Sequence, residues 1–191
     1  MSQGVCPWWL GYLLACPLRR LFQNPEEIFR PFLREGMTVL DVGCAMGFFT
    51  LPLAGLVGPN GRVIAVDMQE RMIRSLKKRA TKAALDSRIE TRICSSGGLG
   101  IDDLACQIDL AVAFAVVHEV PTPASLFAEI RPSLKADGKF LIAEPTGHVH
   151  ADQFEETVRI AEQAGFCIVE RPDIRRSRSV LLRPIERGGK S

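Results

Sequence analysis

Apolar and polar residues follow two distinct patterns along this chain. Short, nearly unbroken apolar runs bounded by glycine, proline or charged residues are typical of buried strands. Between them lie longer stretches in which apolar residues recur at helical spacing. The clearest is 70–85, which has Met72, Ile73, Leu76 and Ala80 on one side and a row of basic residues on the other. Strand and helix signals alternate, which predicts a parallel sheet with helices on both faces.

This pattern predicts strands at 39–42, 62–67, 89–94, 109–117, 139–144, 166–171 and 177–183. It predicts helices at 25–36, 48–56, 70–85, 123–134 and 152–164. Asn24 and Asp152 are the expected N-caps of two of these helices, and Gly36 and Gly165 are the expected stops. The last two strands are joined by a short loop, so we expect them to form an antiparallel pair that closes the alternating order.

The segment 5–18 is mostly apolar and contains Trp8, Trp9 and Tyr12. It is shorter than the ~20 residues that span a bilayer, and no positive segment precedes it, as a signal peptide would require. We interpret it as a helical cap over a pocket, with an interfacial membrane anchor as the alternative. The expected organisation is a cap or lid over 1–35, a main domain over 36–187 and a disordered tail over 188–191.

Composition adds little to this picture, and charge adds one feature. The chain is 47% hydrophobic and 24% charged, as is usual for a soluble globular protein, and its net charge of +2 argues neither for nor against nucleic acid. Residues 171–191, however, hold seven basic residues against two acidic ones. This segment could meet phosphate, or it could be a charged edge strand. Six cysteines without a C-x-x-C pair predict a reducing, cytoplasmic compartment and no disulfide framework.

A glycine-bracketed turn follows the first predicted strand and opens a helix. It reads Asp41-Val42-Gly43-Cys44-Ala45-Met46-Gly47. This stretch resembles the first motif of class I S-adenosylmethionine-dependent methyltransferases, acidic-x-Gly-x-Gly-x-Gly, with Ala45 in place of the middle glycine. The resemblance covers roughly residues 25–184. It implies an α/β, Rossmann-like fold with a mostly parallel seven-stranded sheet, an antiparallel C-terminal strand and helices on both faces.

The resemblance also implies a cofactor, S-adenosylmethionine, which would leave as S-adenosylhomocysteine. Gly43, Cys44, Ala45 and Gly47 would pass near its methionine part, and Asp41 would orient their loop. The alternative is a structural turn that binds no ligand.

Three further positions complete the implied cofactor site. Asp67 ends the second strand, where a carboxylate can accept hydrogen bonds from both ribose hydroxyls; capping of the next helix is the alternative. Met68 would pack on the adenine, and Ser95 would hydrogen-bond to it in place of the usual acid. A nicotinamide site is disfavoured because its fingerprint requires glycine at the sixth position from Gly43, where this chain has Phe48.

All three histidines of the chain fall in two loops, after the fourth and fifth predicted strands. His118 is the candidate catalytic base, with Glu119 or Glu144 as the orienting carboxylate. His148 and His150 lie in the second loop. The alternative is that these are loop histidines without chemistry. The spacing of the histidines does not support a metal held by all three, or by His148 and His150 with Cys44, so no metal is predicted.

We therefore expect an enzyme that methylates a small, apolar or aromatic acceptor, acting as a monomer or homodimer. Two rivals stay open. One is a nucleic-acid methyltransferase that uses Arg175, Arg176, Arg178 and Arg183, although the chain lacks the Asn/Asp-Pro-Pro-aromatic element of base-amine methylation after the fourth strand. The other is a non-catalytic module that binds the cofactor and meets a partner through its aromatic N-terminus.

Overall fold

A computed structural model describes residues 23–95 and 97–185. Most of the predicted cap over 1–35, including the apolar segment 5–18, lies outside the described residues, as does the predicted tail over 188–191. The strands are β1 (Thr38–Val42), β2 (Arg62–Asp67), β3 (Ile89–Ile93), β4 (Ile108–Phe114), β5 (Leu134–Pro145), β6 (Phe166–Glu170) and β7 (Ser177–Pro184). The helices are α2 (Pro25–Phe29), α3 (Thr50–Leu56), α4 (Glu70–Lys82), α5 (Pro123–Ser133) and α6 (Ala151–Gln163), with short 3-10 turns η2 (Asp86–Arg88), η3 (Asp102–Leu104) and η4 (Val117–Glu119).

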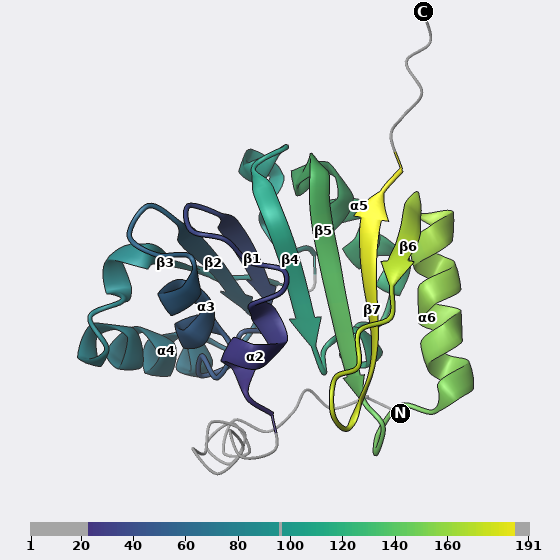
Figure 1. Cartoon of the computed structure of the whole chain (residues 1–191), viewed down its shortest axis with the longest axis horizontal. Helices are drawn as coiled ribbons and strands as arrows, with labels where there is room; N and C mark the ends of the chain where they lie inside the picture. The colour runs from purple at the N-terminus through teal and green to yellow at the C-terminus, as the bar shows by residue number, and fades with distance from the viewer. Residues whose placement is uncertain (1–22, 96, 186–191) are drawn as a thin grey trace, which may run out of the picture.

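The strands form one sheet in the order β3-β2-β1-β4-β5-β7-β6 (Figure 1). The pairs β1–β2, β2–β3, β1–β4 and β4–β5 are parallel, whereas β7 runs antiparallel to both β5 and β6. The predicted fold class is thereby confirmed. The carboxyl ends of β1 to β5 meet at one edge of the sheet, which is where α/β folds of this kind bind their ligands.

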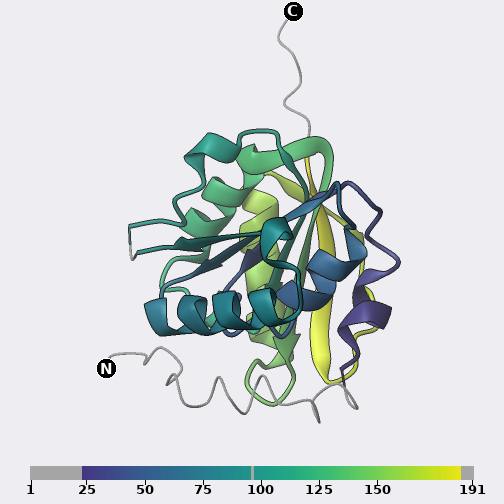
Figure 2. The same cartoon turned by 90° about the vertical axis from the view of Figure 1, so that its left-hand side faces the viewer.

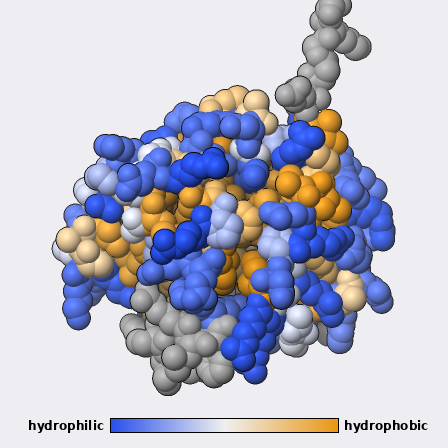
Figure 3. Space-filling view, in the orientation of Figure 1, coloured by the Kyte–Doolittle hydropathy of each residue, from blue (hydrophilic) through white to orange (hydrophobic). Residues whose placement is uncertain are grey.

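Helices cover the sheet on both faces, because successive side chains along a strand point to opposite sides (Figures 1 and 2). In β1, Leu40 and Val42 pack in the cluster under α5 and α6, and Val39 packs in the cluster under α2 and α3. Helix α4 contributes Ile73 and Leu76 to a third cluster. Its buried residues are the four that the helical periodicity predicted. On the face seen in Figure 3, polar residues surround apolar ones in the middle.

Several predicted boundaries are wrong. Strand β5 begins at Leu134 and not at residue 139, directly after α5 ends at Ser133. The N-cap of α6 is His150 and not Asp152, since its backbone N–H donates to the side-chain oxygen of Gln153 at 3.0 Å. The fourth strand ends at Phe114, three residues before the apolar run does, because Ala115 takes a positive φ of 58° that an extended strand does not allow.

The helix before β1 is also shorter than predicted. Helix α2 starts where expected, with the Asn24 side chain accepting from the Glu26 N–H at 3.2 Å, but it ends at Phe29. Phe29 is fully buried against Phe49 and Phe114, with ring centroids 5.7 and 5.4 Å away. No helix within the described residues is long and apolar enough to cross a membrane.

Candidate cofactor and methyl-transfer site

The loop after β1 bends toward β2 and then turns into α3. The backbone N–H groups of Gly43 and Cys44 both donate to the carbonyl of Val66, at 2.8 and 3.1 Å. Gly43 has φ +71° and Gly47 has φ +84°, and a Cβ at Gly43 would collide with the Val116 side chain. Both positions therefore favour glycine, for conformation and for close approach, since a Cβ at Gly47 would meet the Leu76 side chain.

Ala45, the departure from the glycine pattern, also lies in the left-handed region, with φ 45°. Its backbone N–H donates to Oδ2 of Asp67 at 2.9 Å. This bond joins the loop to the end of β2, so that two strand ends and the intervening turn form one polar rim.

Asp41 lies beneath this loop with only 3% of its surface exposed. Its Oδ2 accepts a hydrogen bond from the Thr50 hydroxyl at 2.6 Å, which joins β1 to the first residue of α3. Burial raises the pKa of Asp41 to about 7; the Thr50 bond opposes that rise and the Asp67 charge adds to it. The carboxyl therefore holds a proton at a higher pH than an exposed aspartate does.

Asp67 is the last residue of β2 and is partly exposed. Besides the Ala45 bond, its Oδ1 accepts from the backbone N–H of Gln69, the N-cap of α4, at 2.8 Å. Burial raises the pKa of Asp67, and these two backbone bonds oppose the shift. Each carboxylate oxygen keeps a lone pair, which is the acceptor pair that a ribose diol requires. The adjacent Met68 is 50% exposed and offers an apolar contact for a base.

Ser95 starts the loop after β3, beside Asp67. The Cys94 N–H donates to the Asp67 carbonyl at 3.1 Å, and Ser95 exchanges two backbone bonds with Gly98 at 3.2 Å. The Ser95 Oγ accepts from the Gly97 N–H at 3.2 Å, which leaves the hydroxyl hydrogen to donate. Burial raises the pKa of the Cys44 and Cys94 thiols, so both stay protonated at neutral pH.

A second polar centre lies at the ends of β4 and β5. Glu144 is 1% exposed, and its Oε2 lies 2.5 Å from Nδ1 of His118, while its Oε1 accepts from the Val117 N–H at 2.7 Å. Burial raises the pKa of Glu144, and His118 opposes that rise. With Nδ1 engaged, Nε2 is the ring nitrogen left to accept a proton. The His118 side chain is 30% exposed.

The other predicted residues near this centre differ in how they relate to His118. Of the two carboxylates offered as partners for His118, Glu144 makes the bond and Glu119 is exposed. The His148 ring stacks near that of His118, with centroids 6.4 Å apart and planes 19° from parallel. His150 caps α6. Among residues 23–95 and 97–185, no group of three or more His, Cys, Asp or Glu side chains could hold a metal ion.

Parts of the basic C-terminal segment contact the fold itself. Arg178 donates to the Val149 carbonyl at 3.2 Å, and Arg171 pairs with Glu155 on α6 at 2.8 Å. These two side chains are used to hold β7 and the loop before it. Sequence reasoning missed Thr50, whose role is visible only once the strand and helix are placed side by side.

The fold is the one that class I methyltransferases share. Residues 33–175 match the model of a family described as a methyltransferase domain. This match spans more than half of the chain, so the chain belongs to that family. The predicted methyltransferase family is thereby confirmed.

Solved structures agree with this assignment of the fold. The chain is similar to an S-adenosylmethionine-dependent methyltransferase from Aquifex aeolicus, with a TM-score of 0.85, 23% identity, and coverage of 95% of this chain and 100% of that one. It is also similar to a protein from Methanococcus maripaludis described as a methyltransferase of the same kind, with a TM-score of 0.79, 17% identity and 98% coverage of both chains.

Curated relatives are longer proteins. The human mitochondrial ubiquinone biosynthesis O-methyltransferase is 36% identical over 130 residues, which cover 59% of this chain and 33% of that protein. The nocamycin O-methyltransferase of Saccharothrix syringae is 30% identical over 133 residues, covering 62% of this chain and 45% of the relative. The chain thus spans between a third and a half of the length of these two relatives.

Proposed function

We propose that this protein transfers a methyl group from S-adenosylmethionine to a small acceptor that loses a proton in the reaction. The observation that carries the proposal is the Asp67 carboxylate, held at the end of β2 by the N–H groups of Ala45 and Gln69, at 2.9 and 2.8 Å. That arrangement leaves a partly exposed pair of acceptors where a ribose diol can bind, next to the exposed Met68.

In this proposal the residues of the glycine loop bind the cofactor through their backbone. Gly43, Cys44, Ala45 and Gly47 bring bare backbone against the methionine part of the cofactor, and Asp41 fixes the loop from below through Thr50. Ser95 donates its hydroxyl hydrogen toward a ring nitrogen of the adenine. The cofactor itself supplies an activated methyl group, so alignment of the acceptor provides much of the rate.

His118 is the proposed general base. Its Nδ1 is fixed by the buried Glu144, so Nε2 can take a proton from the acceptor while Glu144 stabilises the charged ring. A base is needed for a hydroxyl or another acidic group, and not for an acceptor that attacks through a free lone pair. Two of the curated relatives are named as O-methyltransferases, which agrees with an oxygen acceptor.

The proposed acceptor is apolar or aromatic, because the N-terminal segment of the sequence is rich in aromatic residues, among them Trp8, Trp9 and Tyr12. We further propose that 36–187 is the catalytic domain, which includes most of the family match over 33–175. Free cysteines at the described positions 44, 94, 106 and 167 support a reducing compartment such as the cytoplasm.

The direct test is an acceptor screen. The full-length protein is incubated with S-adenosylmethionine and a panel of phenols, catechols, thiols, arsenite and short RNA, and the S-adenosylhomocysteine formed is measured. Turnover with a hydroxylated aromatic supports the proposal. Turnover with RNA alone would favour the nucleic-acid rival, and cofactor binding without turnover on any acceptor would favour a non-catalytic module.

A further inference from the structure

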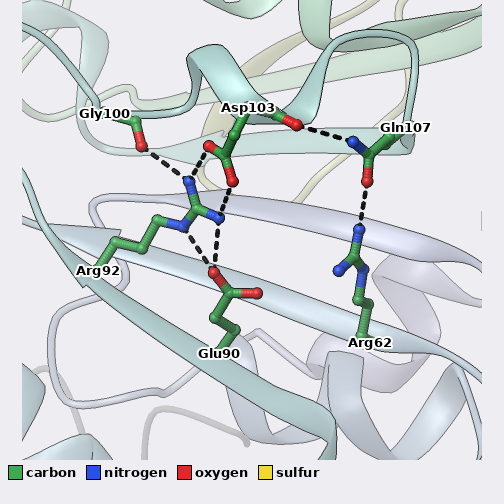
Figure 4. Close-up of polar contacts among 6 residues, drawn as sticks. All are labelled: Arg62, Glu90, Arg92, Gly100, Asp103 and Gln107. Atoms are coloured by element: carbon green, nitrogen blue, oxygen red, sulfur yellow. Dashed lines mark hydrogen bonds and ion pairs between the residues drawn. The ribbon is translucent and has the colours of Figure 1, made fainter.

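Arg92 on β3 holds the loop between β3 and η3 through its guanidinium group (Figure 4). Nε donates to the Glu90 carboxylate at 2.7 Å, and Nη1 donates to the Gly100 carbonyl at 2.8 Å. Nη1 and Nη2 donate to the two oxygens of Asp103, at 2.5 and 2.8 Å. Only 19% of the Arg92 side chain is exposed, and a bidentate, charge-assisted pair of this kind is both strong and directional.

The same network continues to β2. The Gln107 side chain donates to the Asp103 carbonyl at 2.8 Å, and Arg62 donates to the Gln107 side-chain oxygen at 2.7 Å. Figure 4 shows Arg62 and Arg92 reaching from neighbouring strands to the segment 100–107. Two strands therefore fix the far end of the loop.

A second anchor acts from the opposite side. Glu129 on α5 accepts the backbone N–H of Leu99 at 2.6 Å, and the Leu99 side chain is buried. At Gly98, which has φ +147°, a Cβ would lie 2.9 Å from the same carboxylate. The stretch 97–100 is thus held from two sides. Glu129 binds the backbone at Leu99, and Arg92 binds it at Gly100.

This stretch belongs to the loop that opens beside Asp67. Ile93 pairs with Asp67 across β3 and β2, and the Cys94 N–H donates to the Asp67 carbonyl. If Asp67 holds the ribose as proposed above, the attached base can reach this neighbouring loop. The shape of 97–100 therefore affects how well the base fits.

We propose that Arg92 is a positioning residue that shapes the 97–100 loop against the adenine of the bound cofactor. The proposal rests on the cofactor site described above. A loop that is already ordered loses less conformational freedom on binding, and a lysine could not reproduce the three-way fork of Arg92. Arg92 thereby contributes to affinity and to recognition of the base without touching the ligand.

The test compares binding of two probes by calorimetry: S-adenosylhomocysteine, and S-inosylhomocysteine, in which oxygen replaces the 6-amino group. Arg92→Met is expected to weaken S-adenosylhomocysteine binding about five- to tenfold. The same substitution should weaken binding of S-inosylhomocysteine less, so that the ratio of the two dissociation constants becomes smaller. Arg74→Met is the matched control, since Arg74 makes an exposed pair with Glu70 on α4. Asp103→Asn, at a side chain 64% exposed, is a second variant that does not endanger folding.

The outcomes separate this inference from the proposed function. If the wild-type protein binds neither probe, the cofactor site itself is wrong. If the wild-type binds and both Arg92→Met and Asp103→Asn bind like it, the positioning role is wrong. Equal weakening of both probes would also overturn it, because a merely structural loss would not distinguish the bases. Should Arg92→Met fail to fold, Asp103→Asn decides the question.

Discussion

Nδ1 of His118 lies 2.5 Å from Oε2 of the buried Glu144. The pair joins η4 to the end of β5, since the other Glu144 oxygen accepts the Val117 N–H. A buried carboxylate that binds one ring nitrogen selects the tautomer in which the other can act as a base. This contact therefore makes Nε2 of His118 the proton acceptor of the proposed reaction.

Replacement of His118 by Asn should lower the methylation rate by about 10²- to 10⁴-fold for a hydroxylated acceptor, because the base is lost. Binding of S-adenosylhomocysteine should change little, as His118 is not part of the cofactor loop. Steady-state kinetics and calorimetry check the two parts. His150→Asn, at the exposed cap of α6, is the control and should keep normal turnover. Full activity in His118→Asn would remove this residue from the mechanism.

Asp41 should make folding stability fall as pH rises. Its pKa is raised from 3.8 to about 7 by burial, so between these values the folded state holds a proton that the unfolded state has lost. The free energy of unfolding therefore decreases from about pH 4 to pH 7, by on the order of 4 kcal/mol if this group acts alone. The raised pKa values of Asp67 and Glu144 act in the same direction.

Urea denaturation at pH 5 and pH 8 measures this slope. Asp41→Asn should flatten it, whereas Asp152→Asn, at an exposed position on α6, should leave it as in the wild type. If the Asp41→Asn variant keeps the slope of the wild type, the buried Asp41 carboxyl does not cause the pH dependence of the free energy of unfolding.

Gly43→Ala should destabilise the fold by about 1–3 kcal/mol, because the new Cβ would meet Val116 in a backbone conformation that alanine disfavours. Gly55→Ala is the matched control. Gly55 is an exposed residue of α3 with open space around it, so this substitution should stabilise the fold by about 0.5–1 kcal/mol. Thermal unfolding of both variants tests the pair. Equal effects of the two substitutions would contradict the close approach at Gly43.

Much of the fold follows from local sequence patterns, but pairing between distant groups does not. The strand 62–67 and the buried side of α4 were predicted correctly because periodicity is local. The end of β4 was not, since Ala115 carries no signal of its positive φ within an apolar run. The choice between Glu119 and Glu144 depended on the parallel register of Phe114 with Ala143, which no single segment encodes.

The loop after β3 illustrates the same limit. Its glycines were visible in the sequence, whereas the anchors Arg92 and Glu129 lie outside it, on β3 and α5. Asp152 is a better intrinsic N-cap than histidine, yet α6 starts after His150, because the Gln153 side chain is placed to accept its N–H.

The measurement that tests the central claim most directly is calorimetric binding of S-adenosylhomocysteine to the wild type, to Asp67→Asn and to the exposed control Asp86→Asn. We predict binding by the wild type and the control, and a loss of roughly 2 kcal/mol or more in Asp67→Asn, about 30-fold in affinity, because the ribose hydroxyls lose their charged acceptor. Absence of binding by the wild type, or equal binding by Asp67→Asn, would contradict the cofactor site described here.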